Sequence, residues 1–301
     1  MEPGYVKTHK QGILKERTEE LRRKLQDCTL CPRNCHADRL SGDLGTCKTG
    51  EFAMVSSYIP HFGEESPISG QRGSGTIFFT NCNLLCNFCQ NYDISHEGGG
   101  QQVSPTQLAD MMLRLQAMGC HNINFVTPSH VVPQILQGLI LAVEGGLRIP
   151  LVYNSGGYDH VSTLQYLDGI IDVYMPDFKF WDDNIAHETC DATDYPEFAK
   201  RAIIEMHRQA GDLKINNMGI AERGLLIRHL VMPGNVAGTR KIMNFLCSDI
   251  SADTYINIMP QYRPCGKACD NPALNRPVNR KEYQDAIQDA ISAGLTRLDQ
   301  I

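Results

Sequence analysis

The sequence predicts an α/β fold, a partial (β/α)6 TIM-like barrel with a small N-terminal cysteine-rich extension. Three observations carry this prediction. Six short apolar runs are typical of buried strands, the segments between them have helical periodicity, and seven of the twelve cysteines lie in two groups within the first 89 residues. Strands that alternate with helices imply a parallel sheet, and right-handed crossovers curl such a sheet into a barrel.

The expected elements follow in chain order. The strands are residues 76–80, 122–126, 150–153, 170–175, 225–231 and 255–259. The helices are residues 105–118, 131–144, 162–168, 196–210 and 238–250, with 280–293 as a terminal helix. A further amphipathic helix over residues 13–26 leads into the first cysteine group. We therefore divide the chain into an N-terminal helix (1–27), a cysteine-rich metal-binding extension (28–70) and the barrel (71–301).

Composition restricts the class of protein. The formal charge of −6 provides no broad basic surface, so we expect no nucleic-acid partner. The first 27 residues are polar and do not resemble a secretion signal, and we find no run of about 18 apolar residues that could span a bilayer. The sequence therefore predicts a cytoplasmic protein that does not cross a membrane. Twelve cysteines in a reducing compartment favour metal binding over disulfides.

The central cysteine group directly follows the first predicted strand. Cys82, Cys86 and Cys89 lie on one short loop at the carboxyl end of this strand, and the active sites of barrel enzymes lie at that end of the sheet. Three thiolates leave one iron of a four-iron cluster without a protein ligand. Two alternatives remain, which are a zinc loop with a remote fourth ligand such as His96, and a set of inert core thiols.

This loop reproduces a C-x3-C-x2-C signature, with the aromatic Phe88 directly before its last cysteine. In these features the sequence resembles the radical S-adenosylmethionine superfamily, whose partial barrel is of the type predicted above. The resemblance implies that Cys82, Cys86 and Cys89 hold a [4Fe–4S] cluster, and that the open iron takes the amino and carboxylate groups of S-adenosyl-L-methionine. It also implies reductive cleavage of this cofactor to a 5′-deoxyadenosyl radical that abstracts hydrogen, with electrons from a reductant such as flavodoxin or ferredoxin.

Within the superfamily the chain is most similar to pyruvate formate-lyase activating enzymes, whose cluster loop also ends in cysteine, a polar residue and asparagine. Here that ending is Cys89-Gln90-Asn91. The resemblance implies that Phe88 packs near the adenine and that Arg228 reaches the cofactor. The cofactor-binding residues that it implies are Phe88, Asn91, Thr127, Ser129, His130, Asn154, Ser155, Asp177, Lys179, Arg228 and Tyr262.

Two strand ends depart from the activase pattern. Thr127, Ser129 and His130 stand where the relatives have a Gly-Gly-Glu motif for the cofactor's amino group. The sixth strand ends without the histidine that lies near the adenosine in the relatives, so Tyr262 or Arg263 is expected to replace it.

Asp177 and Lys179 lie in a segment that resembles the activase Met-Leu-Asp-Leu-Lys motif. The resemblance implies that Asp177 and its neighbours bind a monovalent cation and that Lys179 lies near the cofactor carboxylate. The alternative for both residues is a solvated rim pair. His229 is expected to point to the opposite face from Arg228, as a structural residue.

The first cysteine group contains four thiols, Cys28, Cys31, Cys35 and Cys47, which are enough for a tetrahedral zinc site or a complete [4Fe–4S] cluster. Gly42 and Gly45 permit the return that brings Cys47 back to the others. The spacing does not distinguish the two metals, and unused thiols remain an alternative. We expect Cys265 and Cys269 to be reduced thiols, although Cys265 could also face the substrate.

Three functions are consistent with the sequence. The first is an activase-like enzyme that abstracts hydrogen from a glycine Cα of a partner protein, with the N-terminal extension shaping the docking surface. The second directs the same radical chemistry at another peptide or a small molecule. The third is a zinc or electron-transfer scaffold without turnover, which requires a closed metal site at the central loop.

Overall fold

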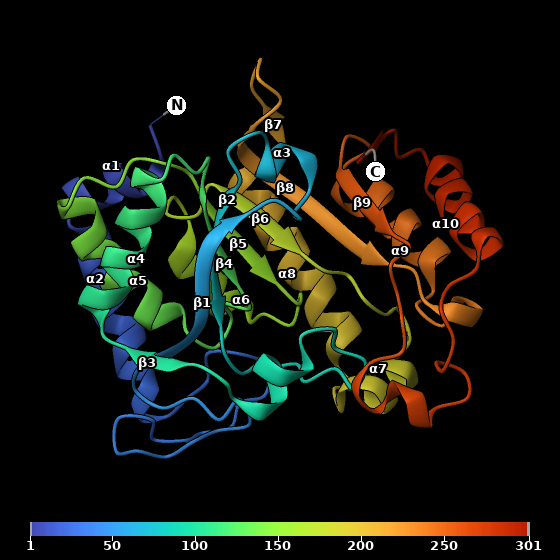
Figure 1. Cartoon of the computed structure of the whole chain (residues 1–301), viewed down its shortest axis with the longest axis horizontal. Coiled ribbons are helices and arrows are strands. Elements are labelled where there is room, and N and C mark those ends of the chain that lie inside the picture. The colour runs from blue at the N-terminus through green and yellow to red at the C-terminus, as the bar shows by residue number, and fades with distance from the viewer. Residues whose placement is uncertain (1, 300–301) are drawn as a thin grey trace.

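A computed structural model of the chain describes residues 2–299 and contains one curved, mostly parallel sheet. The strand order is β10-β9-β8-β6-β5-β4-β2-β1-β3, and β7 pairs with β8 outside this path (Figure 1). In the described part of the chain no pairing joins β3 to β10, the two ends of this order, so the barrel is open. The predicted partial barrel is confirmed.

The six predicted strands all form, and they are the parallel strands of the barrel. Their bounds are β2 Ser74–Phe79, β4 Ile123–Val126, β5 Leu151–Ser155, β6 Val173–Pro176, β8 Ala221–Leu230 and β9 Tyr255–Met259. Each pairs in parallel with the next strand of this series. Their apolar runs are continuous because the barrel interior and the surrounding helices bury both faces of the sheet.

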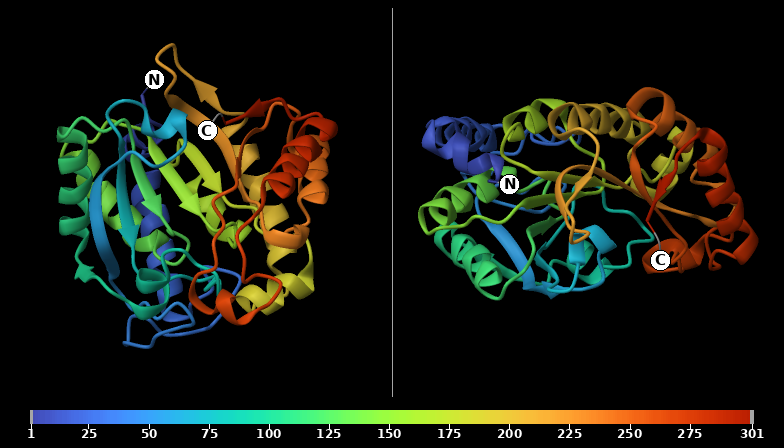
Figure 2. Two further views of the ribbon diagram at one scale, coloured as in Figure 1. Left: turned by 45° about the vertical axis from the view of Figure 1, so that its right-hand side comes forward. Right: turned by 90° about the horizontal axis from the view of Figure 1, so that it is seen from above.

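The predicted helices also form. They are α2 Ile13–Arg23, α4 Pro105–Ala117, α5 Val132–Glu144, α6 Val161–Leu164, α8 Tyr195–Ala210, α9 Thr239–Phe245 and α10 Arg280–Ala293. Two are shorter than expected, because a 3-10 turn at Gln165–Leu167 follows α6 and a π turn at Leu246–Ile250 follows α9. Figure 2 shows these helices around the outside of the curved sheet. Capping boxes at Ser104 and Asn279 fix the starts of α4 and α10, because each cap side chain and its partner three residues later satisfy amide groups that the helix leaves free. None of the helices within residues 2–299 is long and apolar enough to cross a bilayer.

Several elements were not expected from the sequence. They are α1 Gly4–Lys10, α3 Ser66–Ser69, α7 Asp183–Cys190, β1 Ala53–His61, β3 Gln101–Val103, β7 Lys214–Ile215 and β10 Arg297–Leu298. The most consequential is β1, which pairs antiparallel with β2 and so extends the barrel sheet. The range 28–70, which the sequence analysis assigned to the extension, therefore includes a strand of the sheet.

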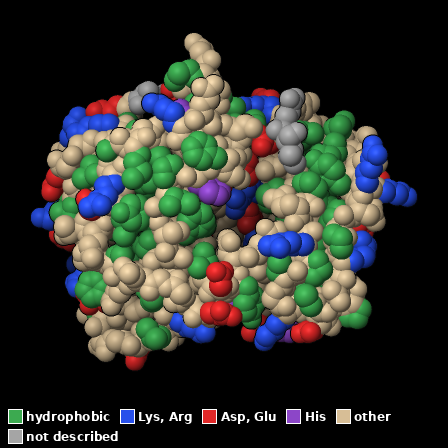
Figure 3. All heavy atoms as spheres, in the orientation of Figure 1, with side chains coloured by type: hydrophobic (Ala, Val, Ile, Leu, Met, Phe, Trp, Pro, Cys, Tyr) green, Lys and Arg blue, Asp and Glu red, His purple; other side chains and the backbone are tan. Residues whose placement is uncertain are grey.

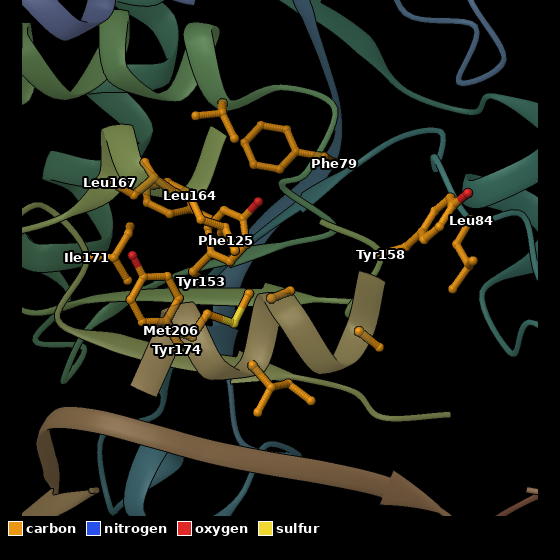
Figure 4. Close-up of a cluster of buried hydrophobic side chains, with 14 of the residues drawn as sticks. Phe79, Leu84, Phe125, Tyr153, Tyr158, Leu164, Leu167, Ile171, Tyr174 and Met206 are labelled. Carbon is orange, nitrogen blue, oxygen red and sulfur yellow. The ribbon is translucent and has the colours of Figure 1, made fainter. Parts of the chain in front are cut away.

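A layer of aromatic side chains connects the strands to the helices. Figure 4 shows Phe79, Phe125, Tyr153 and Tyr174, one from each of β2, β4, β5 and β6, with Met206 of α8 beside them. The rings of Phe79 and Phe125 stack at 6.2 Å, and those of Tyr153 and Tyr174 meet edge to face at 5.9 Å. Aromatic pairs in these arrangements add to the free energy gained by burial, so this layer holds the strand ends in fixed positions.

Candidate active site

A cavity of about 240 Å³ lies at the carboxyl ends of the parallel strands. Every strand of the parallel series contributes to its wall or ends directly beside it. One lining residue, Phe79, is the end of β2. Ten more come from the cysteine loop and its continuation, which are Asn81, Cys82, Leu84, Cys86, Phe88, Cys89, Gln90, Asn91, Ile94 and Ser95. The remaining lining residues are Val126, Thr127, Asn154, Ser155, Gly156, Asp177, Lys179, Arg228, Leu230, Met259 and Gln261.

The three cysteines of the central loop all line this cavity. The loop turns sharply, since Asn81 and Leu85 have positive φ values of 70° and 56°. Burial raises the pKa of Cys82 to about 12, and the nearby Cys86 thiol adds to the rise. A hydrogen bond with Cys190, together with burial, raises the pKa of Cys86, and burial and Cys86 raise the pKa of Cys89. The three thiols are therefore close neighbours in an environment that disfavours the free thiolate.

The donor set fits a [4Fe–4S] cluster. Such clusters are held by thiolates, and a bound metal centre supplies the positive charge that buried thiolates need. Lys179 lowers the pKa of both Cys86 and Cys89, so the protein itself contributes in the same direction. In the present side-chain orientations, no three His, Cys, Asp or Glu side chains within residues 2–299 converge on one metal position, and Cys86 faces Cys190.

A buried network of charges forms the opposite wall. Asp177 accepts hydrogen bonds from Lys179 Nζ at 2.5 Å and from Arg228 Nε at 2.8 Å, and Arg228 Nη2 donates to Asn154 Oδ1 at 2.7 Å. The side chains of Asp177 and Lys179 are only 13% and 16% exposed, so they do not form a solvated rim pair. Burial alone would raise the pKa of Asp177, but Arg228 and Lys179 hold it below its ordinary value. Asp177 is therefore ionised, and it fixes two cations at the cavity wall.

The cavity edge contains strained backbone at Thr127. This residue has a φ of 60°, which is rare for a β-branched side chain. Its amide donates to the carbonyl of Asn154 at 2.9 Å, so the neighbouring strand end holds it in place. Strain of this kind persists only where the surroundings enforce it, and it concentrates at functional sites. The strain marks the position at which the sequence departs from the activase pattern.

Three of the predicted cofactor-binding residues lie outside the cavity wall. Ser129 and His130 are buried, and His130 Nε2 lies 3.1 Å from the carbonyl of Thr80. Burial, together with Arg39, lowers the pKa of His130 to about 3, so it is a neutral structural residue. The hydroxyl of Tyr262 donates to the carbonyl of Leu274, and its ring packs 6.2 Å from that of Phe88. Gln261, one position earlier, lines the cavity instead.

Two histidines take structural positions. His96 stacks on Tyr92 at 4.0 Å and pairs with the hydroxyl of Ser95. His229 bridges the carbonyl of Phe178 and the hydroxyl of Thr239, on the face of β8 opposite Arg228. Since neither ring lines the cavity, the remote-ligand alternative for His96 has no support from its position.

The four cysteines of the first group lie close together beside the loop of Cys82, Cys86 and Cys89, which we call the cluster loop. Burial raises the pKa of Cys31 to about 12, and the thiols of Cys47, Cys28 and Cys35 each add to the rise. Gly45 permits this approach, because a Cβ built on it would lie 2.3 Å from Cys35 Sγ. The return of the chain that the sequence analysis expected at this glycine therefore places all four thiols in one region.

Two arginines of this segment contact the barrel, and one of them, Arg33, holds its cysteine loop. Arg33 Nε donates to the carbonyl of Asn83 at 2.8 Å, and Arg33 Nη2 donates to those of Leu84 at 3.1 Å and Cys190 at 2.7 Å. Arg39, which is 1% exposed, donates to the carbonyl of His130 at 2.8 Å. Neither contact was expected from the sequence, because both join segments that are far apart in the chain.

Comparisons with known proteins show the family of the chain. A family model described as the Radical SAM superfamily matches residues 76–245, more than half of the chain. The uncharacterized protein MJ0674 of Methanocaldococcus jannaschii is 29% identical over 287 residues, which cover 93% of this chain and 78% of that protein. Among solved structures, methylornithine synthase (PylB) aligns with a TM-score of 0.44 and 12% identity, over 72% of this chain and 67% of that chain.

Proposed function

This chain belongs to the radical S-adenosylmethionine superfamily, and on that basis we propose that it cleaves S-adenosylmethionine reductively at a [4Fe–4S] cluster and abstracts hydrogen from a glycine of a partner protein. One observation carries the proposal. Three cysteines on one loop, of which Cys86 is buried and Cys82 and Cys89 are partly buried, line the same cavity as the Asp177–Lys179–Arg228 network.

The roles of the residues follow from their positions. Cys82, Cys86 and Cys89 would hold the cluster, and the chemistry that the bound cluster and cofactor supply is one-electron cleavage followed by hydrogen abstraction. Lys179 and Arg228 place positive charge where a cofactor carboxylate can bind. Each carboxylate oxygen of Asp177 accepts one hydrogen bond from these cations, and a monovalent cation beside Asp177 stays a proposal.

The apolar part of the wall excludes water from the reaction. Phe88 is buried, and its ring meets that of Phe180 edge to face at 5.6 Å. Leu230 and Met259 continue this surface on β8 and β9. A dry, apolar wall protects a reactive radical from side reactions and offers a face on which an adenine can pack.

A second target is favoured by the backbone at Thr127. Its strained turn replaces the activase motif for the cofactor's amino group, and a changed motif is consistent with a changed substrate. The second candidate function is therefore radical modification of another peptide or of a small molecule, with the same cluster and the same cofactor.

Anaerobic reconstitution with iron and sulfide tests the shared chemistry. With dithionite and S-adenosylmethionine, the full chain is expected to release 5′-deoxyadenosine, as measured by liquid chromatography. Cys86→Ala should abolish this release, whereas Cys247→Ala, which changes a thiol outside the cavity, should retain it. A closed, catalytically inert metal site would give no product from the unmodified chain. A glycyl radical signal on a co-incubated partner would then distinguish the first target from the second.

We also propose that the four cysteines of the first group hold a structural metal, either zinc or a second [4Fe–4S] cluster. Their mutual proximity and the close approach at Gly45 support this proposal. Metal and sulfide analysis of the full chain carrying Cys82→Ala, Cys86→Ala and Cys89→Ala separates the two metals. Zinc without sulfide, or iron with equimolar sulfide, would each support a filled site, and the absence of both would contradict it.

A further inference from the structure

A second cavity, of about 440 Å³, lies beside the first and is lined by residues of β8, of β9 and of the segment that follows β1. Arg228, Met259 and Gln261 line both cavities, so the two cavities adjoin at β8 and β9. Its other lining residues are Gly63, Glu64, Glu65, Ser66, Asn257 and Asp299. Figure 3, in the orientation of Figure 1, shows a hollow near the middle of this face with acidic and basic side chains beside it.

Glu65 is the central side chain of this second cavity. It follows β1 and is only 6% exposed, and its Oε1 accepts a hydrogen bond from Asn257 Nδ2 of β9 at 2.9 Å. Its Oε2 has no hydrogen-bond partner among the described residues, and neither does Asn257 Oδ1. Buried acceptors left unpaired are costly, so two of them on residues that line one cavity indicate a missing donor.

The second cavity is lined by more acidic than basic side chains. Three carboxylates line it, those of Glu64, Glu65 and Asp299, and Arg228 is the cation in its wall. Arg228 is already hydrogen-bonded to Asp177, and its Nη1 lies 3.6 Å from Glu64 Oε2. The tyrosine hydroxyl of Tyr255 donates to Asp299 at 2.6 Å. The carboxyl groups of the lining therefore outnumber its guanidinium by three to one, and burial raises the pKa of Glu65 and of Asp299 because it disfavours their charged forms.

We propose that this second cavity binds the ammonium or guanidinium group of the substrate, with Glu65 and Asn257 as its direct acceptors. A cationic donor would satisfy both unpaired oxygens and offset the surplus of carboxylates. The wall that the two cavities share places the rest of such a substrate beside the cofactor site. The inference rests on the proposed radical function and names its substrate class, a compound or peptide that carries a basic group.

The test uses the full chain, reconstituted anaerobically and saturated with S-adenosylmethionine. Saturation-transfer NMR measures the affinity of three probes: Nα-acetyl-lysine amide, the uncharged Nα-acetyl-norleucine amide of similar length, and n-butylammonium. Both cations are expected to bind, and norleucine amide at least about tenfold more weakly than the lysine probe. Tighter binding of the lysine probe points to a basic side chain in a peptide as the source of the group, and tighter binding of n-butylammonium points to a small amine.

Variants assign this binding to the second cavity. Glu65→Gln should lower the affinity for both cations about tenfold or more. Asp299→Asn, which changes a half-buried position, should lower these affinities to a lesser degree. Glu144→Gln, at an exposed carboxylate outside both cavities, should leave the affinities unchanged. Equal binding of lysine and norleucine probes, or undiminished cation binding in Glu65→Gln and Asp299→Asn, would overturn the inference. The 5′-deoxyadenosine assay is independent, so failure of the radical function would be seen separately.

Discussion

At the scale of single residues, Arg33 shows how a side chain can act at a distance from its own sequence neighbours. It stands between Cys31 and Cys35, yet its guanidinium donates to carbonyls of the cluster loop and of the end of α7, including that of Asp191. A planar guanidinium can serve several carbonyls at once, which a lysine ammonium cannot do with the same geometry. Arg33 is therefore a positioning residue for the cluster loop.

Replacing Arg33 by methionine keeps the length of the side chain and removes these donors. We expect the cluster loop to loosen, because carbonyls of Asn83, Leu84 and Cys190 each lose a charge-assisted hydrogen bond. The measurement is the electron paramagnetic resonance spectrum of the reduced cluster, with and without S-adenosylmethionine. A broadened or shifted signal is expected for Arg33→Met, and a native spectrum for the exposed Arg201→Met would serve as control. An unchanged spectrum in Arg33→Met would contradict the positioning role.

Asp177 gives a prediction about pH. Its pKa is lowered in the folded chain by Arg228 and Lys179, so its ionised form stabilises the fold at pH values above the unfolded pKa of about 3.9. That contribution is lost as the pH falls toward the folded pKa. Asp177→Asn should therefore reduce the free energy of unfolding by about 3 kcal/mol at pH 7, because two buried cations lose their partner.

Urea denaturation of both proteins across pH measures this effect. The difference between the unmodified chain and Asp177→Asn should be constant from pH 7 to about pH 5 and shrink below about pH 4. A difference that grew toward low pH would show that the aspartate is protonated in the native state.

Most of the residues that the resemblance implied for the cofactor line the first cavity, and their cofactor-binding roles stay predictions. Asp177, Lys179 and Arg228 line the cavity, as the motif resemblance implied. Tyr262 does not line it and Gln261 does, because successive residues of an extended segment point to opposite sides. A one-residue difference of this kind depends on the exact end of β9, which apolar periodicity does not define.

At the scale of elements, the parallel strands and their helices could be predicted because their apolar runs are buried on both faces. The strand β1 was missed since it contains Ser56, Ser57 and Pro60 and has one partly exposed face, so no continuous apolar run marks it. Its antiparallel pairing also carries no crossover helix, and so breaks the alternation on which the prediction relied.

The turn after β5 gives a prediction at this scale. Gly157 has a φ of 77°, and a Cβ built on it would lie 2.2 Å from the carbonyl oxygen of Asp177. An alanine in the left-handed region costs about 1–2 kcal/mol of stability. Gly157→Ala should lower the free energy of unfolding by more than this, because the new Cβ also displaces the segment that carries Asp177.

Gly12→Ala is the matched control for this change. Gly12 has the same φ of 77°, and a Cβ there would meet no atom of the described residues within 4 Å. Thermal unfolding of both variants separates the two contributions. Equal losses of stability would show that the contact with Asp177 relaxes at little cost.

At the scale of the whole molecule, hydrogen bonds connect the N-terminal segment directly to the barrel. Arg33 and Arg39 join the four-cysteine segment to the cluster loop and to His130, and Asn81 Nδ2 donates to the carbonyl of Lys48 at 3.3 Å in the same region. A metal held by Cys28, Cys31, Cys35 and Cys47 would fix the segment from which these contacts are made. We therefore expect that metal binding by the first cysteine group affects the rate of 5′-deoxyadenosine release at the second group, although the two groups are separate in sequence.

The double variant Cys31→Ser, Cys47→Ser tests this coupling. If the four thiols hold a metal, the variant should lose it, lower the melting temperature of the full chain, and reduce the rate of 5′-deoxyadenosine release at least about tenfold, because a small misplacement of a reacting group is costly. Serine at Cys247 should leave all three quantities unchanged. The decisive comparison is with the electron paramagnetic resonance signal of the reduced cluster, which should shift in the same direction as in Arg33→Met if both changes act through the cluster loop. Loss of the N-terminal metal with a native signal and native turnover would show instead that the two cysteine groups function independently.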